Sequence, residues 1–200
     1  SSSDGNWAAY GNDAGTNGAS RYIPVGQSFF VKANANGPAL SMNNNVRVHN
    51  SQAFLKNSKE VNNLLRIKAV TQNYGDEIIV RYHESATDNF DENFDAAKLY
   101  GFGDSPQLYS FSDDDFKLSI NSLKTTEENK ILQLGFEMEV PGEVNLMFSS
   151  MDTFDPETSF HLHDLLTGVT IDVRSNLEYT FLSDPDNDPL RFQLEINHSS

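Results

Sequence analysis

Residues 78–111 read IIVRYHESATDNFDENFDAAKLYGFGDSPQLYSF, and the fold is organised around this stretch. Its first six residues alternate, with three apolar side chains on one face and Ile79, Arg81 and His83 on the other. A loop rich in Asp follows, then an aromatic turn at residues 100–103, and then a second short apolar run. The stretch therefore predicts two β-strands joined by an acidic loop.

The same period-two alternation continues on both sides and is strictest in the last third of the chain. Every second residue from Leu132 to Val140 is apolar, and Pro141-Gly142 then turns the chain. More apolar runs lie at spacings of roughly ten residues, namely Phe116–Ile120, Val144–Phe148, Phe160–Leu162, Val169–Val173, Leu177–Phe181 and Leu190–Ile196. The alternation predicts that Leu134, Phe136, Phe192 and Leu194 point into the core. One helical turn, around Asp91 to Lys98, is the sole helical candidate. About a dozen half-buried strands at this spacing predict an all-β fold, an antiparallel β-sandwich with jelly-roll connections.

The N-terminal third is less regular. We expect an irregular segment at residues 1–20, a buried strand that starts at Phe29–Val31, and a second strand over about Leu40–Val48. A polar connection at residues 50–62 leads into the alternating run that starts near Leu64. The expectation is a single domain over residues 1–200, with core strands within 21–197 and an N-terminus cut from a longer protein.

Composition restricts the function classes. The chain has 29 acidic and 14 basic residues and a formal net charge of −15. Nucleic acids and anionic membranes are poor partners for such a chain, because both need clustered Lys and Arg. No apolar run approaches the roughly 18 residues of a membrane span, so no membrane insertion is expected. The chain has no cysteine, which excludes disulfides, thiolate catalysis and Cys-ligated zinc.

The acidic loop is the first candidate site. Asp88, Asp91 and Asp95 lie within eight residues of one another, and Ca²⁺ prefers several oxygen ligands that converge from one loop. These three residues are therefore candidate calcium ligands. The alternative is a structural loop in which an Asp caps a helical turn and Asp95 pairs with Lys98. The sequence leaves both open.

Two other polar patterns have simpler explanations. Asp184, Asp186, Asp188 and Glu195 nearly match the spacing of an EF-hand calcium loop, but Pro189 replaces the required glycine. A Pro/Asp turn between two strands is the favoured interpretation. His161 and His163 have the H-x-H spacing that can bind zinc. Because the sequence offers no evident third ligand, an exposed sheet face is the favoured interpretation.

Exposed aromatic side chains suggest a second kind of site. Trp7, Tyr100 and Phe102 lie in turns and loops and could stack on sugar rings. The alternative is that they pack within their own loops. For catalysis, the sequence has no Gly-x-Ser-x-Gly nucleophile elbow and no phosphate-binding glycine loop. We therefore expect a protein that is not an enzyme.

Several stretches together also resemble a known family. They are RYIPVGQSFFVKA (21–33), NNNVRVHNSQAFLK (43–56), LLRIKAV (64–70), residues 78–111, and YTFLSDPDNDPLRFQLEI (179–196). The most specific part is the pattern T-D-x-F-D-x-x-x-D-A-x-K-L from Thr87 to Leu99. The chain resembles a β module of large secreted surface proteins of Bacteroidota, which precedes a C-terminal sorting domain read by the type IX secretion system.

This resemblance implies an extracellular or outer-surface location and, as partners, the other domains of a parent protein. It attaches no catalytic residues to the module. The expected function is thus a non-catalytic accessory or adhesin-type module. The alternative is a carbohydrate-binding module attached to a glycan-active enzyme, with an extracellular glycan as its partner. An enzyme ranks third.

Overall fold

The alternating stretches form the strands of one large sheet in the computed structural model, which describes residues 7–25, 27–31, 36–48, 62–126 and 128–198. A two-stranded hairpin precedes this sheet, formed by β1 (Tyr10–Gly11) and β2 (Ala14–Gly15). The strands of the sheet are β3 (Leu64–Val70), β4 (Gly75–His83), β5 (Ala96–Ala97), β6 (Gln107–Phe111), β7 (Lys117–Lys124), β8 (Lys130–Glu137), β9 (Gly142–Ser149), β10 (Ser159–Asp164), β11 (Val169–Asp172), β12 (Glu178–Ser183) and β13 (Phe192–Asn197).

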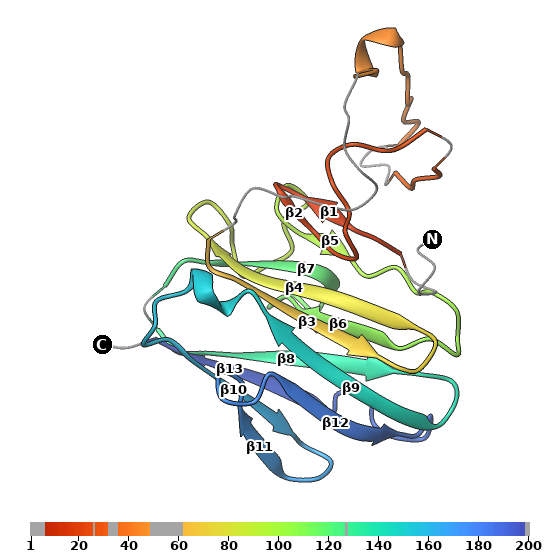
Figure 1. Cartoon of the computed structure of the whole chain (residues 1–200). Helices are drawn as coiled ribbons and strands as arrows, with labels where there is room; N and C mark the ends of the chain where they lie inside the picture. Colours follow the sequence, from red (N-terminus) through yellow and green to blue (C-terminus); the bar gives the residue numbers. More distant parts are fainter. Residues whose placement is uncertain (1–6, 26, 32–35, 49–61, 127, 199–200) are drawn as a thin grey trace.

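Hydrogen bonds order the sheet as β11-β10-β13-β8-β6-β7-β4-β3-β9-β12, with β5 paired to β7 (Figure 1). Among the described strands, neighbours are antiparallel, as predicted, except that β4 and β7 run parallel in a register that opposes Ile79 and Ile120. A parallel pair needs a crossover connection. Here the acidic loop, β5 and β6 supply it between residues 84 and 116.

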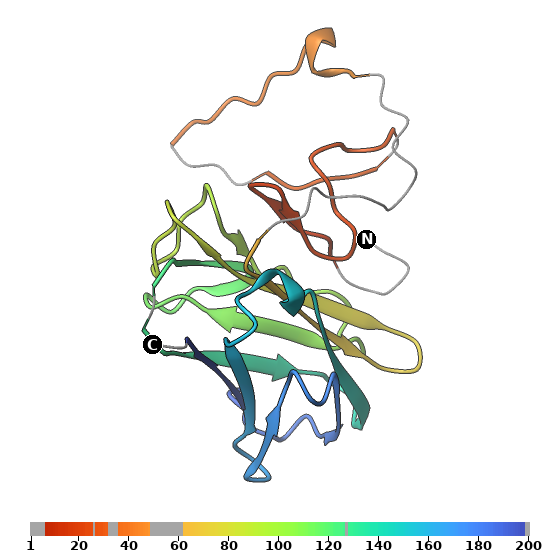
Figure 2. The same cartoon turned by 60° about the vertical axis from the view of Figure 1, so that its left-hand side comes forward.

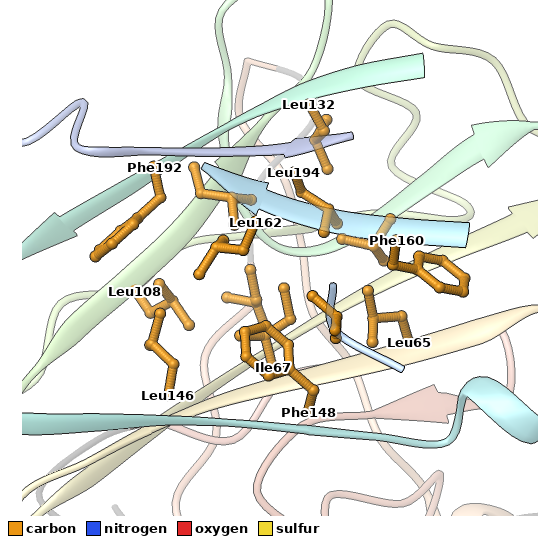
Figure 3. Close-up of a cluster of buried hydrophobic side chains, with 14 of the residues drawn as sticks. Leu65, Ile67, Leu108, Leu132, Leu146, Phe148, Phe160, Leu162, Phe192 and Leu194 are labelled. Atoms are coloured by element: carbon orange, nitrogen blue, oxygen red, sulfur yellow. The ribbon is translucent and has the colours of Figure 1, made fainter. Parts of the chain in front are cut away.

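The sheet curls so that two of its regions face each other across an apolar core. Figure 3 shows side chains of β8, β10 and β13 on one side pointing toward side chains of β3 and β9 on the other. The members that the sequence placed in the core, Leu134, Phe136, Phe192 and Leu194, are all buried. The prediction of an all-β fold is confirmed.

A buried ion pair links strands from the two ends of the strand order. Arg191, just before β13, donates to both carboxylate oxygens of Asp164 on β10, at 3.0 and 2.7 Å. The same guanidinium donates to the backbone oxygen of Leu182 on β12, at 2.8 Å. Tyr179, also on β12, donates its hydroxyl to Asp164 at 2.8 Å. One ion pair therefore links three strands from opposite ends of the strand order.

The second face of β4 is also covered. Ile79 packs with Leu64, Ile120 and Ala14 of the N-terminal hairpin in a second apolar cluster. Arg81 lies on this face, as predicted, but is buried because the hairpin and the acidic loop enclose it. Its guanidinium donates to the backbone oxygen of Asn12 at 2.7 Å and its Nε donates to Ser122 Oγ at 2.8 Å. The N-terminal hairpin is thus part of the folded body.

The strands expected at Phe29–Val31 and Leu40–Val48 are absent, and those two predictions are wrong. Phe29, Phe30 and Val31 are exposed and lie outside any strand. Residues 36–48 lie away from the sheet and contain a single 3-10 turn, η1 (Asn44–Val46) (Figure 2). The Asn43 side chain accepts a hydrogen bond from Asn45 N at 2.9 Å, and such local bonds compete with strand pairing. Residues 49–61, most of the expected polar connection, lie outside the described residues.

The helical candidate at residues 91–98 is one turn only. Asp95 N donates to Asp91 O at 2.7 Å, and β5 begins at the next residue. A second 3-10 turn, η2 (Met151–Thr153), follows β9. In the described part of the chain, no helix has the length and apolar character to cross a membrane.

Candidate ligand-binding groove

The aromatic turn between β5 and β6 is held by one buried glutamine. Gln107 Oε1 accepts from Gly101 N at 3.0 Å, and its Nε2 donates to Phe102 O at 3.1 Å and to Ser105 Oγ at 2.9 Å. Ser105 N and Oγ both donate to Phe102 O. These bonds fix the backbone around Phe102, so its ring is 59% exposed on a rigid support.

A groove of about 240 Å³ lies between this aromatic turn and the loop that joins β12 to β13. Its lining comes from three parts of the chain: the turn, the end of β8, and the β12–β13 loop. The lining residues are Tyr100, Gly101, Phe102, Gly103, Gln107, Phe136, Glu137, Met138, Glu139, Ser183, Asp184, Pro185, Asn187, Asp188, Pro189 and Arg191.

The β12–β13 loop forms the second wall through bonds to its own backbone. Asp184 Oδ1 accepts from Asp186 N at 3.0 Å, and Asp188 Oδ1 accepts from Leu190 N at 2.9 Å. Phe136 N donates to Pro189 O at 2.8 Å, which ties the loop to β8. This is the Pro/Asp turn between strands that the sequence favoured over an EF-hand loop.

Tyr100 enters a polar network at the edge of the groove. Its hydroxyl accepts from Lys117 Nζ at 2.8 Å and donates to Glu137 Oε1 at 3.2 Å. The same carboxylate oxygen accepts from Lys117 at 3.0 Å and from the buried Tyr109 hydroxyl. Burial acts to raise the pKa of Glu137, but the hydrogen bonds from Tyr109, Lys117 and Tyr100 hold it below its ordinary value. Glu137 is therefore a fixed carboxylate.

Arg191 lines the groove, and its guanidinium is bonded to Asp164 behind it. The guanidinium lies over the Phe181 ring, 4.4 Å from its centroid. Burial acts to raise the pKa of Asp164, but the bonds from Arg191 and Tyr179 hold that pKa below its ordinary value. The Asp164 carboxylate is therefore the counter-ion of the Arg191 guanidinium.

The three aromatic residues proposed from the sequence do not form one platform. Tyr100 and Phe102 line the groove. Trp7 supports the turn from outside, because its Nε1 donates to Tyr100 O at 3.1 Å. Its ring packs edge-on against Phe30, with centroids 4.6 Å apart.

The three proposed calcium ligands each have separate protein donors. Asp88 accepts from Lys124 N at 3.1 Å and from Lys130 Nζ at 3.2 Å. Asp91 Oδ1 accepts from the backbone and side chain of Asn93, both at 2.9 Å.

Asp95, the third of these carboxylates, is buried. It accepts from Asp91 N and Ser122 N, both at 2.7 Å. Burial raises its pKa above the ordinary value despite these two bonds. Across the described residues, no group of three or more acidic or histidine side chains is arranged to hold a metal ion. The geometry favours the alternative, a structural loop.

The structural alternative paired Lys98 with Asp95, and this pairing is wrong. Lys98 Nζ lies 2.6 Å from Asp76 Oδ2, not on Asp95, and both side chains are almost fully buried. Asp76 is the second residue of β4, and its carboxylate also accepts from Leu108 N at 2.7 Å. A buried cation requires a carboxylate inside the fold, and Asp76 supplies it because the buried Asp95 accepts from Asp91 N and Ser122 N instead.

The two histidines share a face of β10, as expected from their spacing. His163 Nε2 lies 3.0 Å from Glu195 Oε2, and its Nδ1 lies 2.8 Å from Thr170 Oγ1. Glu195 thus belongs to this outer face and not to the Asp184–Asp188 loop. Sequence reasoning missed Glu139 and Arg191 as groove residues, because they come to the aromatic turn from distant segments. It also missed Gln107, although Gln107 bonds to the turn from five residues beyond Phe102.

Comparison with curated proteins and with solved structures finds no match. Residues 1–196 match a family described as a domain of unknown function (DUF8693). This match covers the N-terminal hairpin and all three parts of the groove, namely the aromatic turn, the end of β8 and the β12–β13 loop. The chain therefore belongs to the DUF8693 family of domains of unknown function.

Proposed function

We propose that this chain is a non-catalytic binding module of a larger secreted or surface-displayed protein, and that its groove binds a saccharide. The observation that carries the proposal is the exposed Phe102 ring, fixed on a hydrogen-bonded turn at the mouth of a 240 Å³ groove. Ligand pockets combine apolar surface with a few fixed polar groups. A flat ring beside carboxylate and amide oxygens suits a sugar, which has an apolar face and a rim of hydroxyls.

Rigidity supports binding by this turn. A ligand that meets a preformed surface loses less free energy to ordering of the protein. Gln107 is 4% exposed and makes its bonds within residues 101–105, so the turn has its shape before any ligand arrives. The opposite wall is also held in shape without a ligand, because Asp184 and Asp188 accept hydrogen bonds from backbone amides of the same loop.

The state of the carboxylates supports binding rather than turnover. Glycoside hydrolysis needs a carboxylic acid whose pKa is raised, so that it can protonate the leaving group. Glu137 has the opposite shift, since Tyr109 and Lys117 stabilise its ionised form. The pKa of Asp164, the carboxylate that pairs with the groove residue Arg191, is likewise held below its ordinary value.

The location on a larger secreted protein rests on the sequence resemblance to the module that precedes a type IX sorting domain. A saccharide ligand fits that setting, because adhesin and glycan-active domains occur beside such modules. The partners proposed are thus other domains of the parent protein and an extracellular glycan.

A panel of immobilised neutral and charged oligosaccharides tests the proposal. We expect binding to at least one member, and we expect Phe102→Ala to remove it. Since Phe102 is mostly exposed, this variant keeps its far-UV circular dichroism and melting temperature. Phe29→Ala is the matched control, because Phe29 is a similarly exposed ring outside the groove.

Gln107→Ala extends the test to the supporting turn. It leaves Gly101 N without its acceptor, and we expect weaker saccharide binding with the Phe102 ring still present. The proposal fails if no saccharide binds, if binding survives Phe102→Ala, or if Phe29→Ala weakens binding as much as Phe102→Ala does.

A further inference from the structure

The charges around the groove are unevenly distributed. Its lining contains four carboxylates, on Glu137, Glu139, Asp184 and Asp188, and one cation, Arg191. The whole chain is acidic, but these four carboxylates lie in the groove itself, where a bound ligand would contact them.

The cations at the groove are already paired. Arg191 directs its guanidinium fork at Asp164, and the side chains of this pair are 4% and 1% exposed. Lys117, at the edge, is 3.0 Å from Glu137. Lys98, behind the turn, is buried on Asp76. An anionic ligand would therefore meet no free positive charge among these three side chains.

Glu139 is different from the other carboxylates. Its backbone N donates to Gly103 O at 2.8 Å, which places it at the end of β8 beside the aromatic turn. Its carboxylate lies against Gly103 and is exposed, and no donor from the described residues reaches it. Asp184 and Asp188, on the opposite wall, each use one oxygen for a backbone amide of their own loop. Negative charge thus lies beside the turn that carries Phe102 and on the wall opposite that turn.

Resting on the proposed saccharide site, we infer that the groove selects oligosaccharides that carry amino groups, over neutral counterparts and over uronic acids. Protonated amines pair with Glu139 and with the Asp184–Asp188 wall while a sugar ring stacks on Phe102. A uronic acid brings like charges together, which weakens its binding. Each exposed ion pair strengthens binding roughly two- to fivefold, so two such pairs give about tenfold.

Three tetrasaccharides of similar size test this inference: a glucosamine tetramer, its N-acetylated form, and a galacturonic acid tetramer. Titration calorimetry is run at a pH of about 5.5, which is above the pKa of an Asp or Glu side chain in water and at which the sugar amines are protonated. We expect the glucosamine tetramer to bind about tenfold tighter than the N-acetylated tetramer, and the galacturonic acid tetramer to bind weakest. Raising salt from about 0.02 M to about 0.5 M should reduce the preference, because exposed charges are then screened.

Two variants separate the groove from the overall negative charge. Glu139→Gln removes one carboxylate from the groove, and Glu84→Gln removes one from an exposed loop outside it. Both change the net charge equally. We expect only Glu139→Gln to lower the preference for the amino tetramer, by about two- to fivefold.

The outcomes distinguish the two claims. If the N-acetylated tetramer binds as tightly as the glucosamine tetramer, or if both Gln variants act equally, the charge selection is overturned. The saccharide site then stands, provided that Phe102→Ala still removes binding. If none of the three tetramers binds, or if Phe102→Ala leaves their binding intact, the saccharide site itself is overturned.

Discussion

Replacing Asp164 by alanine would leave the Arg191 guanidinium buried without its counter-ion. The two side chains are 1% and 4% exposed, and the fork closes at 2.7 and 3.0 Å. Removing one member of such a pair costs about 3–5 kcal/mol, because the remaining charge is not solvated. Tyr179 also loses its acceptor. We therefore expect the free energy of unfolding to fall by about 4 kcal/mol.

Urea unfolding followed by far-UV circular dichroism measures this loss. With a slope of about 2 kcal/mol per molar urea, the midpoint should fall by about 2 M. Asp113→Ala is the control, because Asp113 is 56% exposed in its pair with Lys130. That variant should change the free energy of unfolding by less than about 1 kcal/mol.

The double variant Asp164→Leu/Arg191→Met separates the two parts of the argument. It removes both charges and fills the site with apolar groups, so it should recover most of the lost stability. The reasoning is refuted if Asp164→Ala moves the midpoint no more than Asp113→Ala does. It is also refuted if the double variant is less stable than Asp164→Ala, because the unpaired charge would then not be the cause.

Gly135→Ala should lower the free energy of unfolding by about 1–3 kcal/mol, since the new methyl group would overlap the Tyr109 ring; an unchanged thermal melt would contradict this packing. Asp95→Ala should lower the melting temperature equally with millimolar calcium and with chelator, because its carboxylate serves two backbone amides; a calcium-dependent difference would restore the metal hypothesis. Asp164 and Glu137 have folded pKa values below their ordinary values of 3.8 and 4.5. Their contribution is therefore complete above the unfolded pKa values and is lost as the pH falls through the folded ones, so urea midpoints should be steady above pH of about 5 and decline below about 4.

Alternation predicted most of the sheet, because period two records which face of a strand is buried. It identified every strand from β3 onward except the two-residue β5, and it placed Phe192 and Leu194 in the core. It failed at Phe29–Val31, where an apolar run has no neighbouring strand to pair with. Apolar residues make a strand possible, but pairing requires a partner that local sequence does not specify.

Arg81 shows a second limit. The sequence assigned it to the face opposite Val80, which is correct, but that face is covered by a hairpin around Asn12, 69 residues away in sequence. The same limit applies to the groove. Tyr100 and Phe102 were identified from their exposed turn, whereas Arg191 and Glu139 join them only through the pairing of β8 with β6 and β13. In the acidic loop, Asp88, Asp91 and Asp95 each accept from separate protein donors, and the sequence alone does not specify those donors.

The most direct test of the saccharide groove is an amide chemical-shift titration of the isotope-labelled chain with the oligosaccharide that binds best in the panel. We predict that the shifting amides cluster at residues 100–105 and 183–190, on the two walls of the groove. Residues on the His163 face of β10 should not move. Shifts concentrated on that face or on the N-terminal segment, or none in the groove at saturating ligand, would contradict the proposed site.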